Sequence, residues 1–322
     1  MIRYLARRLA FALFLVVAVS SASLVLARLA PGDFVAESLG TRASREAMAQ
    51  QRARYGLDKS IAGQYRDWLA AAVRLDFGES MQYGRPVRDL IPERAANTAI
   101  LALTALVFAT LVGLPLGVVT GSRRGGAIPG AIRATSVVLL SMPPLLTSLF
   151  LVFLAARTGW LPISGMRSAT VPAGGAFLDL LRHLVVPAAA IGLPLAAMLE
   201  RLQAQAMSEV IGEPFVLATL ARGVPRSRIV WRGALKAALR PIAAVYGLII
   251  GTLLSGSFAV EVITAWPGLG SLMLQALRTR DVFLVAGCAG AGALFLACGT
   301  LVSDVALAAV DPRASEARAE QA

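Results

Sequence analysis

Few side chains in this sequence of 322 residues could do acid–base, nucleophilic or metal chemistry. His183 is the only histidine, so a histidine-based metal cluster is excluded and any histidine base would have to be this one residue. Lys59 and Lys236 are the only lysines, and neither completes the G-x-x-x-x-G-K-[ST] pattern of an ATP-binding P-loop. Cys288 and Cys298 share one apolar run and lie about 15 Å apart along a helix, too far for a disulfide. The sequence therefore predicts a protein that is not an enzyme and that binds no cofactor or metal of its own.

The most informative polar feature is a charged stretch between two apolar runs, residues 213–241, which we call the basic segment. From Arg222 to Arg240 it contains six basic residues and no acidic one. Gly223 is placed to end one short helix in a left-handed conformation, and Pro225 prevents that helix from continuing. We expect two short helices here, forming a compact surface that another subunit could grip.

The elements that must position this segment are apolar runs of membrane-spanning length. Mean hydropathy is +0.69, and several uncharged windows approach or exceed the ~20 residues that cross a bilayer core. The windows are residues 9–27, 95–122, 134–156, 241–260 and 282–303, with a weaker one at 184–199. The weaker window is short and contains Pro187 and Pro194. We expect an all-α polytopic membrane protein with six transmembrane helices.

The windows divide the chain into parts. We expect a cytoplasmic N-terminus with the first span (1–30), an extracytoplasmic segment (31–94), helices two to six (95–310) with a cytoplasmic loop at 205–240, and a polar cytoplasmic tail (311–322). The extracytoplasmic segment has apolar residues at helical spacing around Trp68, so it should fold as a small cap with Gln64 and Arg74 exposed.

Basic residues indicate the orientation. With an inside N-terminus, the inner side of the six spans holds 15 Lys and Arg residues and the short outer segments hold 6. Cytoplasmic loops retain positive charge during insertion, so both termini should face the cytoplasm. The net charge of +12 then reflects insertion into a lipid membrane and gives no support to nucleic-acid binding.

Small residues recur every four positions inside two spans, at Gly113, Gly117 and Gly121 and again at Gly247, Gly251 and Ser255. Such stripes let helices approach closely in lipid. They predict either packing within this chain or contact with a second membrane subunit.

Motifs spread along nearly the whole chain resemble one family, the inner-membrane permeases of ABC importers for dipeptides, oligopeptides and nickel, and specifically the first of the two permease types. The basic segment is similar to the cytoplasmic EAA loop of that family, with Gly223 in the place of its central glycine. The other matching motifs, in chain order, are PGD (31–33), YGLD (55–58), DFGES (76–80), RPVRDLIPER (85–94), SMPP (141–144), GWLPISG (159–165), HLVVPA (183–188), WPGLG (266–270) and DPR (311–313). One departure is Leu217, at a position that is often charged in such loops.

The resemblance implies the fold of a type I ABC importer permease and one half of a translocation pore for peptides. A second permease subunit would complete the pore, two ATPase subunits would bind ATP and Mg, and an extracytoplasmic binding protein would deliver the substrate. The ATPase-coupling residues implied by the match are Glu213, Phe215, Ala218, Thr219, Gly223, Val224, Pro225, Arg226 and Arg228.

A pore between two permeases should be lined by kinked or small-residue helix faces. The candidates are Ser141, Pro143, Pro144 and Ser148 in the third span, and Thr252, Ser255 and Ser257 in the fifth. The alternative is ordinary helix packing, with each hydroxyl bonded back to the preceding turn of its own helix.

Other functions stay open at this point. Nickel complexes or other small solutes could be the cargo in place of peptides. A self-sufficient secondary carrier would normally have ionisable groups deep in the membrane, and only Glu261 and Asp304 lie in the predicted spans, near their ends. A membrane-embedded enzyme would need a catalytic constellation that the sequence does not offer.

Overall fold

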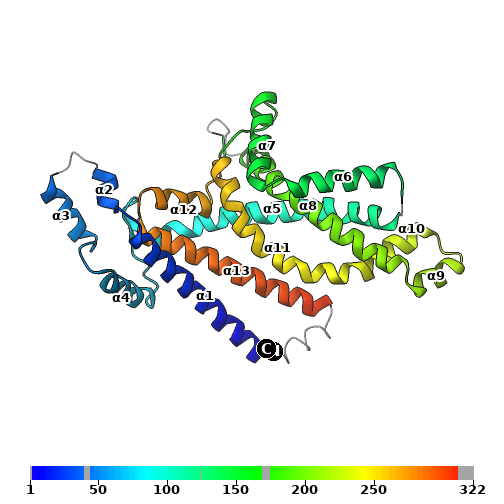
Figure 1. Ribbon diagram of the computed structural model, residues 1–322, viewed down its shortest axis with the longest axis horizontal. Helices are drawn as coiled ribbons and strands as arrows, with labels where there is room; N and C mark the ends of the chain where they lie inside the picture. Colours follow the sequence, from blue (N-terminus) through cyan, green and yellow to red (C-terminus); the bar gives the residue numbers. More distant parts are fainter. Residues whose placement is uncertain (1, 40–43, 124, 169–174, 311–322) are drawn as a thin grey trace. The chain divides into compact units, whose positions relative to one another are not determined.

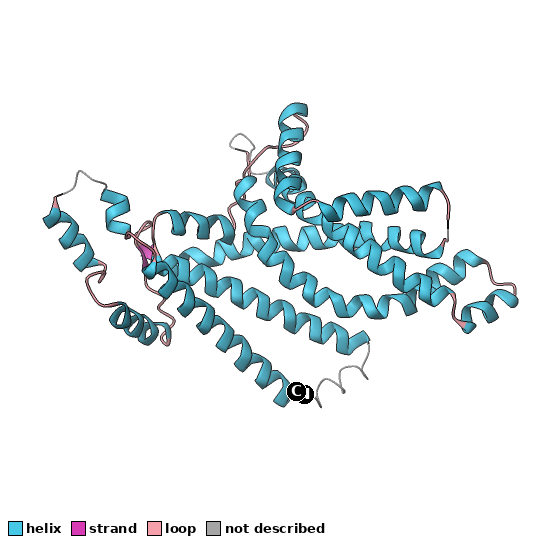
Figure 2. Cartoon of the chain, viewed as in Figure 1, coloured by secondary structure: helices cyan, strands magenta, loops and turns pink. Residues whose placement is uncertain are grey.

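The structure is a computed structural model that describes residues 2–39, 44–123, 125–168 and 175–310, and nearly all of them lie in helices (Figures 1 and 2). The chain divides into two units. The first contains residues 1–99 and 267–298, and the second contains residues 100–266 and the chain from residue 299 onward. The predicted tail at 311–322 lies outside the described residues.

The first unit is built from short helices and one small hairpin around the ends of longer helices. Its elements are α1 (Ile2–Leu29), α2 (Phe34–Leu39), α3 (Arg45–Arg54), α4 (Ile61–Ala72), β1 (Glu79–Ser80), β2 (Arg85–Pro86), the start of α5 (Val87–Ser122), α12 (Leu269–Arg278) and the start of α13 (Val282–Val310). The two strands pair antiparallel, with Ser80 opposite Arg85. The predicted helical fold is confirmed, and this short hairpin, which Figure 2 shows in magenta, is its one addition among the described residues.

A buried carboxylate holds the hairpin against the beginning of α13. Asp281 is fully buried. Its Oδ2 atom accepts from the Ser80 hydroxyl at 2.6 Å and from the Gln82 amide at 3.1 Å. Its Oδ1 atom accepts from the Leu284 amide at 3.1 Å, which satisfies a free donor in the first turn of α13. Asp281 thus joins segments almost 200 residues apart in sequence, with separations of 201 and 199 in the two bonds.

The PGD motif forms the connection between α1 and α2. Gly32 has a φ of +90°, which permits the sharp turn. Asp33 caps α2 by accepting from the Ala36 amide at 2.8 Å, and it accepts from Arg52 of α3 at 2.7 Å. Burial favours the neutral carboxyl, but these donated bonds outweigh it and hold the pKa of Asp33 below its ordinary value. This link between α2 and α3 should therefore persist at neutral pH and be lost only in acid.

The amphipathic helix predicted around Trp68 is confirmed as α4. Trp68 is buried in a cluster with Leu24 of α1 and Ala286 of α13. Beside it, the Tyr65 hydroxyl donates to the Ser21 hydroxyl at 3.2 Å. The apolar face of α4 therefore packs on neighbouring helices of the first unit.

The predicted exposure of Gln64 is wrong, whereas that of Arg74 is confirmed. The Gln64 amide nitrogen donates to the carbonyl oxygens of Gly56 at 2.8 Å and of Lys59 at 3.1 Å. Since these carbonyls belong to the turn before α4, the side chain is drawn inward to satisfy them.

The end of α4 carries an unusual left-handed leucine. The Leu75 amide donates to Ala72 O and the Asp76 amide to Ala71 O, which is the pattern of a Schellman cap. Glycine normally occupies the left-handed position, but here it is Leu75, with a φ of +60°. Val73 and Leu75 are 82% and 69% exposed, so this turn presents two apolar side chains outward.

The second unit is a bundle of long helices. Its elements are the rest of α5, α6 (Ala127–Ser141), α7 (Pro144–Thr158), α8 (Ala176–Ile211), α9 (Pro214–Ala221), α10 (Arg226–Arg228), the π-helical turn η3 (Ile229–Ala234), α11 (Leu235–Ile263) and the end of α13. Leu199, Ile249 and Trp266 are fully buried members of its core.

The predicted third span is two helices at a sharp angle. The helices α6 and α7 meet at 106° (Figure 1). The cause is the Pro143–Pro144 pair, because each proline forces the residue before it out of the helical region. Met142 and Pro143 are accordingly extended, with ψ angles of 117° and 144°. The kink expected at these prolines is confirmed, and it is a sharp break between two helices.

The predicted fourth span proves to be one of the longest helices. Pro187 and Pro194 lie inside α8 without ending it, because each is isolated and removes only one backbone bond. Among the described residues, α1, α5, α8 and α13 are each long and apolar enough to span a membrane. Counting each of two bent pairs, one of which is α6 with α7, as a single span gives six.

The first stripe of glycines brings α5 and α8 together. A Cβ on Gly113 would lie 2.5 Å from the Ala196 carbonyl oxygen, and one on Gly121 would lie 2.4 Å from that of Ala204. At Gly117 it would lie 2.6 Å from both Gln203 Cβ and the Glu200 carbonyl oxygen. Of the two readings of this stripe, packing within the chain is confirmed. Of the second stripe, Gly251 lies where α11 meets Gly299 of α13.

We expect Gly117→Ala to destabilise the second unit by about 1–3 kcal/mol, since the added methyl group would overpack a contact made partly by backbone. The midpoint of thermal unfolding in detergent measures this. Gly130→Ala is the matched control, because Gly130 lies in α6 with no atom within 4 Å of its Cβ position. The control should be neutral or stabilising. Equal midpoints for both variants would contradict the close α5–α8 contact.

Candidate functional site

The first half of the basic segment is the short helix α9. Glu213 precedes it in an extended conformation and Pro214 is its first residue, a position where proline loses no hydrogen bond. The helix ends at Ala221, and two residues later Gly223 has a φ of +78° and donates its amide to Leu220 O at 2.9 Å. The predicted left-handed glycine cap is confirmed. No atom lies within 4 Å of a Cβ placed on Gly223, so only its backbone conformation demands glycine.

The second half is the beginning of a long helix. Pro225 is extended, and its carbonyl accepts from the amides of Arg228 and Ile229. The chain then continues without interruption through α10 and η3 into α11. The prediction of a second short helix is therefore wrong. Because it is continuous with α11, this half is held by the core of the second unit, through the buried residues Val230 and Ala234.

Helix α9 exposes apolar side chains while one residue anchors it. Val216 is buried at 3%, whereas Leu217 and Leu220, three residues apart on one face, are 58% and 40% exposed. Phe215 is 47% exposed. Exposed apolar side chains on a helix held in place from beneath are typical of a protein-binding surface.

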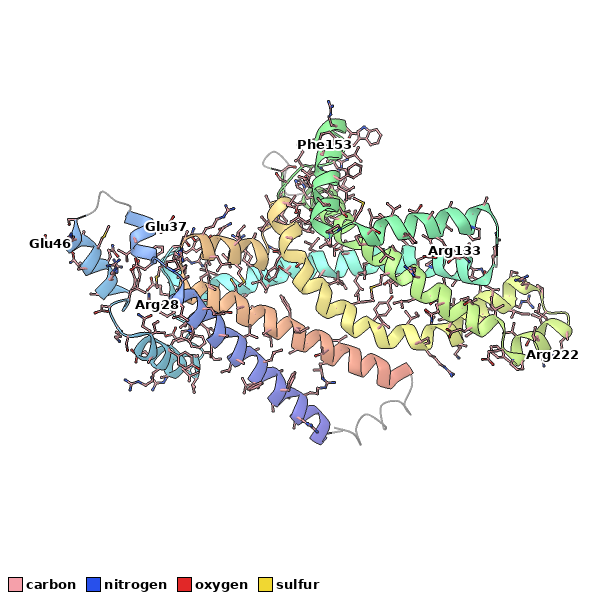
Figure 3. All side chains as sticks on the ribbon, in the orientation of Figure 1. Arg28, Glu37, Glu46, Arg133, Phe153 and Arg222 are labelled. Atoms are coloured by element: carbon pink, nitrogen blue, oxygen red, sulfur yellow. The ribbon has the colours of Figure 1, made fainter. Side chains whose placement is uncertain are left out.

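The predicted ATPase-coupling residues lie on or beside the exposed apolar face of α9. Glu213, Phe215, Ala218, Gly223, Pro225, Arg226 and Arg228 are exposed, and Thr219 and Val224 are half-buried. The Thr219 hydroxyl donates to Phe215 O at 2.7 Å and accepts from Arg222 at 3.1 Å. Figure 3 shows Arg222 in the turn that joins α9 to α10. Their role in coupling stays a prediction.

Two arginines cap the end of α5, where carbonyl groups have no partners within the helix. Arg226 donates to Ser122 O at 3.1 Å. Arg133, labelled on α6 in Figure 3, donates to Thr120 O at 2.7 Å and to Arg123 O at 3.2 Å. Cations also suit the negative end of a helix dipole. The basic segment is thus tied directly to α5, which sequence reasoning missed because it treated these arginines as topology signals.

A cavity of about 1000 Å³ lies between α9 and the ends of α5 and α8. Its lining includes Ser122, Arg123, Ser208, Val216, Leu220 and Trp231. No acidic side chain lines it, and no cluster of metal-ligating side chains occurs in the parts of the chain that the structure describes. The cavity thus adjoins the exposed apolar side chains of α9, since Leu217 and Leu220 are among its lining residues.

The nominated pore residues make mostly local contacts. The hydroxyls of Ser141 and Ser148 donate to carbonyls of their own helices, Val137 O at 2.9 Å and Leu145 O at 2.8 Å. Pro143 and Pro144 form the break between α6 and α7. Ser257 is fully buried. The side chains of Thr252 and Ser255 lie outside the described residues. Assignment of these residues to a pore stays a prediction.

Buried polar residues in the spans were missed. Glu200 and Gln203 of α8 are 1% and 0% exposed. Helix α8 continues through both residues to Ile211, past the predicted window at 184–199. The signal for them is Glu200 itself, which directly follows that window.

We expect Arg226→Ala to loosen the basic segment without unfolding the protein, because it removes one exposed hydrogen bond worth about 1 kcal/mol. Amide hydrogen exchange should speed up in peptides covering 116–123 and 213–226. Arg222→Ala is the control, since the Arg222 side chain bonds to Thr219 within the same turn and not to Ser122 at the end of α5. If both variants exchange like the unmodified protein, Arg226 does not hold α5.

Two family models cover the chain. Residues 1–102 match the N-terminal part of the membrane component of binding-protein-dependent transport systems, and residues 113–316 match the inner membrane component of these systems. The oligopeptide transport system permease protein AppB of Bacillus subtilis is 30% identical over 97% of this chain and 99% of its own length. The dipeptide permease DppB of Escherichia coli is 30% identical over 97% and 98%. The di/tripeptide permease DppB of Pseudomonas aeruginosa is 32% identical over 87% and 89%. The chain belongs to the inner-membrane permeases of binding-protein-dependent ABC importers, and it is a multi-pass, non-catalytic transport component.

Proposed function

We propose that this permease forms half of the translocation pore of an ATP-driven importer for dipeptides or oligopeptides. A second permease completes the pore, two ATPase subunits bind ATP and Mg and dock on the basic segment, and an extracytoplasmic binding protein delivers the peptide. The observation that carries this proposal is α9, an exposed apolar helix closed by a left-handed glycine and fixed to two long helices. The relatives named above, whose names refer to oligopeptides, dipeptides and di/tripeptides, support peptides over nickel complexes or other small solutes.

The proposed orientation places both termini and the basic segment in the cytoplasm. The excess of Lys and Arg on that side, 15 against 6, supports it. The length of α8 agrees, since 36 residues extend about 54 Å against a bilayer core of about 30 Å. A helix of that length can carry α9 beyond the membrane surface, where a soluble ATPase can reach it.

Force from an ATPase would reach the spans along two routes. One is covalent, because α8 leads through Gly212 and Glu213 into α9. The other is the bond from Arg226 to the end of α5. Since α5 and α8 are themselves packed without space for a methyl group along the glycine stripe, movement of α9 should carry both helices together.

We expect Gly223→Val to insert and fold normally, because no atom lies near the new side chain. The left-handed backbone would cost about 1–2 kcal/mol, which should weaken association with the ATPases about 5- to 30-fold and lower peptide uptake. Co-purification and uptake by proteoliposomes measure this. Gly223→Asn is the control, since asparagine tolerates the left-handed conformation. Full uptake by the valine variant would reduce Gly223 to a local structural role.

The proposed site for the binding protein is the extracytoplasmic segment 31–94. Its exposed tip, Val73 and Leu75, gives a sharper test than Gln64, which is buried. A photo-crosslinking residue at either tip position should capture the substrate-loaded binding protein. The same residue at Leu217 should capture an ATPase instead. Capture of the ATPase from the tip would invert the topology, and no capture there would place the docking surface elsewhere.

A further inference from the structure

The least satisfied polar groups of the second unit lie between α5 and α8. Glu200 and Gln203 are 1% and 0% exposed, and Thr120, which faces them from α5, is 0% exposed. Glu200 Oε2 and both amide atoms of Gln203 have no hydrogen-bond partner among the described residues. A buried polar atom without a partner destabilises the folded protein, so three of them together need an explanation.

Neighbouring side chains do not supply the missing partners. The Thr120 hydroxyl has one proton, and within its reach lie Glu200 Oε1 and the carbonyl oxygens of Leu116 and Gly117. It therefore serves one carboxyl oxygen at most and leaves the Gln203 amide unmatched. Opposite Gln203 on α5 lies Gly117, which has no side chain that could pair with the amide. Because α5 and α8 approach closely here, any further partner on this side must be small.

The donors and acceptors define this further partner. Glu200 Oε2 and Gln203 Oε1 need donors, while Gln203 Nε2 needs an acceptor. A metal cation would bind the two oxygen atoms but would be repelled by the amide N–H groups. An anion would accept from the N–H groups but would be repelled by the two oxygen atoms. Water both donates and accepts. Exchanging the amide oxygen and nitrogen changes nothing, because neither is paired.

We propose that Glu200, Gln203 and Thr120 enclose a site for ordered water between α5 and α8. The site offers four polar atoms, within the two to four partners that a buried water requires. On α5 it lies beside Gly117 and Gly121, where the backbone approaches α8 closely, so its water is held at the edge of a tight helix contact.

The site would also fix the register of the two helices. A slip of α8 along α5 would move Glu200 and Gln203 away from Thr120 and place them against apolar side chains. Burying these polar groups without partners costs free energy, whereas a contact between apolar side chains alone would not carry this penalty. Glu200 lies 11 residues before the end of α8, which is about 16 Å along the helix axis, and the basic segment follows that end. The consequence for coupling rests on the proposed function, because register sets where α9 meets its ATPase.

Radiolytic hydroxyl labelling of the intact purified permease tests the water site, because bound water generates radicals beside buried side chains. The reporter is Met207, which is fully buried and one turn from Gln203 on the same face. We expect Met207 to be labelled at least fivefold faster than in the double variant Glu200→Leu with Gln203→Leu. Ile249, 1% exposed in the apolar core, should stay unlabelled in both proteins. Equal labelling of Met207 in both proteins would overturn the proposal.

A second measurement does not require the variant to fold. A cryo-electron microscopy map of the unmodified permease that resolves ordered solvent should show density within about 3 Å of Glu200 Oε2 and the Gln203 amide. Density coordinated by oxygen atoms alone, as for a metal ion, or direct pairing of these groups with protein, would overturn it. The matched variant Thr147→Val, which removes a buried hydroxyl bonded to its own helix, should leave the density unchanged.

Both measurements use the permease without ATPases or substrate, so they stand even if the proposed function fails. Uptake by proteoliposomes then tests the coupling role alone. We expect the double leucine variant to retain its thermal stability, because apolar side chains replace buried polar ones. We expect it to lose at least about 80% of uptake, because the apolar contact no longer fixes one register of α8 along α5. If the double variant loses the labelling of Met207 but keeps full uptake, the water site is supported. Its role in coupling is then overturned.

Discussion

The close approach of α5 and α8 is the constraint on which the second unit depends. At Gly113, Gly117 and Gly121 the neighbouring atoms lie where a Cβ would be, so the two backbones are in contact along the helices. In lipid the hydrophobic effect does not drive helices together, and dense packing of small residues takes its place. The same closeness explains why polar side chains of α8 meet almost no side chains from α5, and why Glu200 and Gln203 need a small partner.

The hydrogen bonds that hold the basic segment are made at the ends of helices and not at their centres. An end leaves carbonyls and amides unpaired, and each must be satisfied by something other than the helix. In this chain Arg133 and Arg226 supply donors to α5, Gly223 closes α9, and Asp281 supplies an acceptor at the beginning of α13. The basic segment is therefore held by hydrogen bonds that its own sequence supplies, while its apolar side chains remain free to bind a partner.

Local features were predictable from the sequence because they depend on a few neighbouring residues. Gly223 followed by Pro225 permits little other than a left-handed cap, and the spacing around Trp68 permits little other than an amphipathic helix. The break at Pro143–Pro144 was also local, and the two prolines predicted a kink there, although not its angle. Contacts between distant segments, such as Asp281 with Ser80, leave no signature in one sequence. Glu200 was missed because a charged residue was taken to end a span, although a packed neighbour can bury it.

Burial differs greatly among the membrane-length helices, and this bears on where a pore can lie. In the most apolar window of α8, 61% of the residues are buried within the chain. In the corresponding windows of α1 and α5 the shares are 11% and 28%. A helix enclosed by its own chain can transmit movement but offers little surface to a passing solute or to a second subunit. The surface for both must come from helices with open faces, where small or hydroxyl residues are accessible. Ser141, exposed beside the break between α6 and α7, meets this condition, whereas Ser148 and Ser257 would first have to be uncovered by movement of their helices.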